Sequence, residues 1–187
     1  MQRSSARRGT VRFAIAALSL PIAVAAGCGD DPPEPITEAE AVALLEALGS
    51  VGQLVLDPAN PSSTTDCPGG GTLTYAGTVV GDPLSGMFTF NAKMTASMCQ
   101  FTSRGFSFEI EAGSVDQAGA MTVMGTSAEL DLELDGNLDW SLPEKEGMCA
   151  VNVDLDGSVT LSNGELTGPV TGMMCGHSIE LDASEFN

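Results

Sequence analysis

Acidic residues recur at alternate positions in one stretch of the chain, where Asp131, Glu133 and Asp135 are followed by Gly136 and Asp139. Carboxylates at the first, third, fifth and ninth positions, with glycine at the sixth, are the spacing of a calcium-binding loop. The twelfth position, where such a loop places a bidentate glutamate, is leucine here. We therefore favour the interpretation that these acids line the wet face of a strand, and we keep a calcium ion shared between neighbouring strands as the alternative.

A catalytic site is not indicated by the other reactive residues. His177 is the single histidine and could act as a general base, but no motif marks a serine or cysteine nucleophile to accompany it. Glu109 with Glu111 has the residue types of a glycosidase pair, yet such pairs arise by chance among 25 acids. The sequence predicts that the protein is not an enzyme.

The cysteines predict two disulfides. Cysteine occurs five times in the chain, at positions 28, 67, 99, 149 and 175. None of the pairs has the short spacing of a zinc site, so the last four are expected to be disulfide-bonded, as in exported proteins. A turn centred near Pro83 would bring Cys67 opposite residue 100, which favours Cys67–Cys99. A turn at Asn163-Gly164 would return Cys175 to within a few residues of Cys149, which favours Cys149–Cys175.

The N-terminus has the layout of a secretory signal peptide. Four arginines precede an apolar run from Phe13 to Ala26, which is too short to span a bilayer permanently. The segment Val24-Ala25-Ala26-Gly27-Cys28 resembles the lipobox of bacterial lipoproteins. That resemblance implies lipidation of Cys28, which would become the first residue of the mature protein. It also accounts for the fifth cysteine and leaves an even four.

Three regions are predicted: a signal peptide (1–27), an acidic, proline-rich tether (28–36) and a single domain (37–187). Removing the signal peptide leaves three basic residues against 25 acidic ones, a net charge of −22. This charge excludes nucleic acid as a partner and disfavours membrane binding other than through the lipid. We expect export by the general secretory route and a monomer. By resemblance to the enteric sorting rule, Gly29 after the lipidated cysteine favours the outer over the inner membrane.

The elements that must position these residues are one helix and a series of strands. Thr37 and Glu40 have the spacing of a capping box, and an apolar stripe of Val42, Leu45 and Leu48, with Ala39 and Ala43 beside it, predicts a helix over 38–48 that ends at Gly49. A further helical turn is considered over 53–56, and 59–66 is expected to be a polar loop.

Strands are predicted by alternation of apolar and polar residues from about 72 onward. Leucines and Trp140 alternate with acids over 130–142, which predicts one continuous strand through Asp135-Gly136 and, by the same parity, another through Asp156-Gly157. A turn-prone stretch is expected over 113–119.

The predicted fold is mainly β, an antiparallel meander of seven to nine strands with the N-terminal helix packed on its apolar face; a two-sheet sandwich is the alternative. The expected function is that of a lipid-anchored envelope protein acting as a non-enzymatic structural or interaction module. Two alternatives are kept: a half-barrel that carries an apolar ligand, whose cavity the nine methionines and seven phenylalanines would line, and a calcium-binding β domain.

Overall fold

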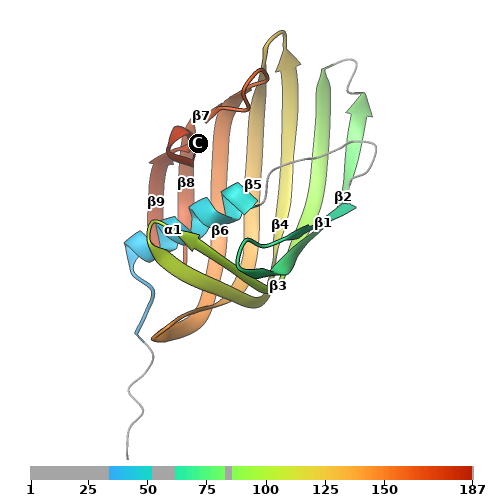
Figure 1. The fold of residues 1–187 in the computed structure, drawn as a ribbon. Coiled ribbons are helices and arrows are strands. Elements are labelled where there is room, and N and C mark those ends of the chain that lie inside the picture. The colour runs from blue at the N-terminus through green and yellow to red at the C-terminus, as the bar shows by residue number, and fades with distance from the viewer. Residues whose placement is uncertain (1–33, 52–61, 83–85, 187) are drawn as a thin grey trace, which may run out of the picture. The chain divides into compact units, whose positions relative to one another are not determined.

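The computed structural model describes residues 34–51, 62–82 and 86–186. These form one antiparallel sheet and one α-helix (Figure 1). The elements in chain order are α1 (Glu38–Val51), β1 (Ser62–Asp66), β2 (Gly70–Asp82), β3 (Met87–Ser103), β4 (Phe106–Met124), β5 (Ser127–Leu142), β6 (Lys145–Thr160), β7 (Leu166–Thr167), β8 (Pro169–Met174), β9 (His177–Asp182) and a final 3-10 turn, η1 (Ala183–Phe186).

The sheet is an open meander in which the strands follow one another in the order β1-β2-β3-β4-β5-β6-β8-β9, with β7 paired to β6. Each long strand pairs with its neighbour in the chain through a hairpin, so the mainly β antiparallel fold expected from the sequence is confirmed. The sheet curls around α1, and the hairpin of β3 and β4 passes in front of the helix (Figure 1). We call the side of the sheet that faces α1 the inner face, and the opposite side the outer face.

Alternation decides which side chains enter the core. In β5 the even-numbered residues from Ala128 to Trp140 face inward, while the acids between them are exposed. The strand runs through Asp135-Gly136 without a break, as expected, and β6 runs through Asp156-Gly157 in the same way. The inner face and the helix together make one apolar core, whose largest fully buried side chains include Phe90, Leu44, Leu73, Met94 and Ile110.

The helix is longer and more buried than the sequence predicts. It continues past Gly49 to Val51, and the further turn considered over 53–56 lies outside the described residues. Residues 40–48 are all buried apart from Glu46, which is half-buried. Ala39, which was expected beside the predicted stripe, is exposed, whereas Leu44 is fully buried although it lies off the stripe. A helix that is apolar around most of its circumference is typical of a protein core. The sheet curves around α1 and so buries it in this way.

Two further expectations for the sheet are wrong. The stretch 113–119 is not a turn but the middle of β4, which is paired with both neighbouring strands over 114–119 and with β5 alone at Gly113. Gly113 has a φ of 126°, next to a register shift between Ile110 and Ala112, so the glycine serves a bulge. The stretch 59–66 is not wholly a loop either, because Ser62–Asp66 forms the exposed edge strand β1.

Enclosure of the helix predicts the effect of truncating Leu44. We expect Leu44→Ala to lower the free energy of unfolding by about 2–5 kcal/mol, the usual cost of deleting a buried leucine. The matched control is Leu161→Ala, because Leu161 is 49% exposed and should change stability little. Denaturant unfolding measures both variants. A Leu44 variant as stable as the Leu161 variant would mean that this side of the helix faces water.

Candidate functional site

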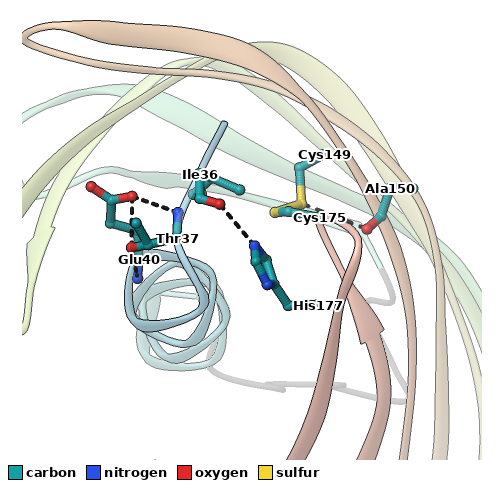
Figure 2. The surroundings of a disulfide bond; sticks show 7 residues. All are labelled: Ile36, Thr37, Glu40, Cys149, Ala150, Cys175 and His177. Carbon is teal, nitrogen blue, oxygen red and sulfur yellow. Dashed lines mark hydrogen bonds between the residues drawn. A yellow bond between two sulfur atoms is a disulfide. The ribbon is translucent and has the colours of Figure 1, made fainter. Parts of the chain in front are cut away.

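The entrance of the helix is fixed by a capping box. The Thr37 backbone N–H donates to Glu40 Oε2 at 2.7 Å, and the Glu40 N–H donates to Thr37 Oγ1 at 3.3 Å. The Thr37 hydroxyl also donates to Glu40 Oε2 at 2.8 Å. These bonds satisfy backbone donors that the first turn of a helix leaves unpaired, as the spacing of the two residues predicts. Figure 2 shows this turn within the curve of the sheet.

Glu40 also receives a cation from the sheet. Lys145, the first residue of β6, places Nζ 3.1 Å from Glu40 Oε1, and Glu34 lies 3.9 Å from the same nitrogen. Burial raises the pKa of Glu40, but the hydrogen bonds from Thr37 and Lys145 lower it by more, so the pKa lies below the ordinary value of 4.5. The buried carboxylate is therefore held in its charged form.

A second ion pair holds the middle of the helix. Arg104, at the tip of the β3–β4 hairpin, donates from Nε and Nη2 to the two carboxylate oxygens of Glu46, each at 2.7 Å. Ser103 adds a hydroxyl donor at 3.2 Å, and Glu185 of η1 lies 3.5 Å from Arg104. We call the Glu40–Lys145 and Glu46–Arg104 pairs the helix clasp. They link α1 to two hairpins, those of β5–β6 and β3–β4.

His177 takes a structural position. Its Nε2 lies 2.8 Å from the carbonyl oxygen of Ile36, which can only accept, so Nε2 is the donor (Figure 2). The bond ties the first residue of β9 to Ile36, which lies two residues before the start of α1. Neither partner of this bond is a nucleophile, and the histidine is engaged in holding the two ends of the domain together.

Both predicted disulfides are formed. Cys67 in the β1–β2 turn bonds to Cys99 of β3, and Cys149 of β6 bonds to Cys175 in the β8–β9 turn. Figure 2 shows the second bridge beside His177. The observed β2–β3 register pairs residues that sum to 169 over most of its length, two more than predicted, and β6 pairs with β7 and β8 at a sum of 325, two fewer than predicted. The pairings survive these offsets because a disulfide tolerates a range of Cα separations. Cys28, the predicted lipidation site, lies outside the described residues.

The predicted calcium ligands lie along the outer face of β5. Asp131, Glu133 and Asp135 are exposed at alternate positions, and Asp139 continues the row. Across the ladder Asp131 faces Asp156 and Glu133 faces Asp154, while Asp135 accepts a hydrogen bond from Asn152 at 3.2 Å. Among the described residues no three His, Cys, Asp or Glu side chains are grouped so as to hold a metal ion. The acids share one face rather than one point, and the calcium site stays a prediction.

Three of the hollows among the described residues have volumes of about 590, 570 and 550 Å³. The largest lies beside the Cys67 loop, where Gln100 donates to Glu109 at 2.9 Å. The smallest lies over the acids of β5 and β6, between Asp131 and Asp156. The largest of the three is lined by Phe101 and Phe108 but by no methionine, and the other two are lined by neither residue type. None of them therefore has the joint methionine and phenylalanine lining that the carrier alternative predicts.

Comparison with known proteins adds no family to this geometry: no family model, no curated protein and no solved structure matches the chain.

The two ion pairs of the helix clasp were not predicted from the sequence, although the small number of basic residues points to their importance. After the four arginines near the N-terminus, the chain has three basic residues, Lys93, Arg104 and Lys145. In so acidic a chain each must lie near carboxylates. Their partners could not be assigned, because both clasp pairs join residues more than 50 positions apart.

The pH dependence of stability should report on Glu40. Because its folded-state pKa is depressed, its contribution is present above about pH 4.5 and is lost as the pH falls through the folded-state value. We expect Glu40→Gln to be less stable than wild type at pH 7, with the difference shrinking toward pH 3. Melting temperatures between pH 3 and 7 measure this, with Glu180→Gln on exposed β9 as the control. A difference that does not vary with pH would contradict the assignment.

The Arg104–Glu46 pair can be isolated by a double-mutant cycle with Arg104→Asn and Glu46→Gln. Arg104 has a φ of 48°, a region that asparagine tolerates, so the turn is kept while the charge is lost. We expect a coupling free energy of about 0.5–1 kcal/mol, typical of a partly exposed pair, that decreases at 1 M salt. A coupling near zero at low salt would show that the hairpin is held by packing alone.

Proposed function

We propose that the protein is an exported lipoprotein, anchored through Cys28, whose β domain works as a non-enzymatic interaction module through its outer face. The observation that carries this proposal is the burial of α1. The helix occupies the inner face of the sheet, where a carrier would hold its ligand, and residues 41–45 are buried without exception. The surface left for a partner is therefore the outer face and the hairpin ends.

The location rests on the disulfides and the charge. Two disulfides are typical of an oxidising compartment outside the cytoplasm. No helix within the described ranges has the length and apolarity needed to cross a membrane. The lipobox-like segment supplies an anchor that needs no such helix, and the tether of residues 28–36 then joins lipid to domain. In this proposal the outer membrane is favoured through Gly29.

The chemistry of the partner follows from the cations. Lys93 pairs with Asp116 at 2.8 Å, and the other two cations belong to the helix clasp. None of the three forms an ion pair with the acids of β5 or β6 in the described part of the chain. A partner with basic groups complements this outer face, whereas anionic surfaces are repelled.

Fractionation of cells that express Cys28→Ser tests the anchor. We expect the variant to leave the membrane fraction, because it lacks the cysteine sulfur to which the lipid would be attached. The β domain itself is unchanged. Gly27→Ala is the matched control, since it keeps a small residue before the cysteine and should stay in the membrane fraction. A Cys28 variant that still partitions with membranes would refute anchoring at this residue.

Native mass spectrometry of the purified wild type distinguishes the two proposed functions, an interaction module and a carrier of an apolar ligand. The expected species is the acylated, disulfide-bonded chain without a further apolar ligand. A stoichiometric lipid that co-purifies with the Cys28→Ser domain would instead support the carrier, and it would require α1 to be displaced.

A further inference from the structure

Seven of the eight methionines of the domain fall into two groups, and the eighth, Met121, is half-buried against the core. Met94 and Met174 lie on the inner face and are 2% and 0% exposed. Five others are exposed, and they are Met148 at 71%, Met87 at 61%, Met98 at 53%, Met124 at 50% and Met173 at 44%. Met98 is the extra residue where two exposed positions follow each other in β3, before the alternation resumes at Cys99.

Methionine dominates the exposed apolar side chains. Seven large hydrophobic residues are strongly exposed in the described ranges, and the two that are not methionine are Val80 and Leu161. Burial cannot explain the choice of methionine at these five positions, since a solvent-facing strand position is ordinarily filled by a polar or β-branched residue. What distinguishes methionine from leucine at an exposed site is the reactivity of its thioether.

Few other readily oxidised side chains compete with the methionine thioethers for an oxidant. The four cysteines in the described part of the chain are already disulfides, of which three are buried and Cys175 is half-buried, and Trp140 is 3% exposed. Exposed thioethers are therefore the sulfur groups in this part of the domain that a small oxidant can reach. A neutral oxidant is also not repelled by a net charge of −22, unlike an anionic one.

We propose that the five exposed methionines are sites of sulfoxidation, with neutral two-electron oxidants of the hypochlorous acid class as substrate. The thioether sulfur gains one oxygen and loses two electrons, the O–Cl bond breaks, and chloride and a proton are released. Thiol-dependent methionine sulfoxide reductases reverse this oxidation in general. The function added to the domain is consumption of oxidant at its surface.

The two faces of the sheet make this reaction harmless to the fold. A sulfoxide is polar, so forming it at Met148 or Met87 places a polar group in water. Forming it at Met94 or Met174 would place the same group in the apolar core, where an unpaired polar group is costly. Burial excludes the oxidant from these two residues as long as the domain stays folded.

Graded oxidation of the folded wild-type protein tests the proposal. Hypochlorous acid is added at 1–10 molar equivalents, and each methionine is followed by peptide mass spectrometry. We expect the five exposed residues to be oxidised at least tenfold faster than Met94 and Met174, with the melting temperature unchanged within about 2 °C. Oxidation of Met94 or Met174 at a comparable rate, or a melting temperature that falls with the first equivalents, would overturn the proposal.

A variant that carries Met→Leu at all five exposed positions provides the second measurement, with Met94→Leu as the matched control. Each protein is mixed with N-acetylmethionine as a reporter, and hypochlorous acid is added. We expect the control to protect the reporter as wild type does, and the five-site variant to lose most of that protection while it keeps the wild-type melting temperature. Equal protection by the folded five-site variant would show that the exposed thioethers do not consume the oxidant.

Discussion

The architecture depends on the burial of one helix on all of its sides. An open antiparallel meander has a single apolar face, and an isolated sheet of this kind would leave that face in water. The curvature of β3–β6 around α1 buries this face, because the helix fills the space that the sheet encloses (Figure 1). The same curvature covers the helix, whose apolar side chains would otherwise also face water. The core thus consists of helix and inner face jointly.

That arrangement explains where the few cations lie. The enclosed helix carries three acids: Glu38 is exposed at its start, whereas Glu40 is buried and Glu46 is half-buried. The last two therefore need partners within the fold. Arg104 and Lys145 meet them from the tips of two hairpins. Two of the three basic side chains in the described ranges thereby hold the sheet closed over the helix. The outer face keeps its acids exposed to water, where like charges cost little and discourage edge-to-edge association.

The sequence predicted the sheet best where one face is wet. In β5 and β6 strict alternation identifies continuous strands even through Asp-Gly, because the parity of Leu134 and Leu138 is incompatible with a two-residue turn. The sequence prediction was wrong where strand pairing holds turn-prone residues in an extended conformation. Residues 113–119 look like a turn, but the ladders of β3 and β5 hold them extended. The polar strand β1 has no apolar member to reveal it; it pairs with β2 through the backbone ladder and through a hydrogen bond of 3.3 Å between the hydroxyls of Thr64 and Thr74.

In the helix, too, the features set by local sequence could be predicted and those set by distant strands could not. Its start at Thr37 and Glu40 is a local signal and was predicted, whereas the burial of Leu44 depends on strands far away in the chain. The acids of β5 were correctly assigned to a wet face, but which of them approach one another depends on register. Arg104 and Lys145 could be recognised as exceptional residues, while their partners required the fold.

The bond between Ile36 and His177 has a consequence for how the chain is made. The two residues are 141 positions apart, although every strand pairs with a near neighbour in the chain. Hairpins can form one after another as the polypeptide emerges, but the first helix waits for the last strand before its enclosure is complete. Non-local closure of this kind slows folding. The apolar helix of a nascent chain is thus not fully enclosed until the final hairpin, β8–β9, has been made.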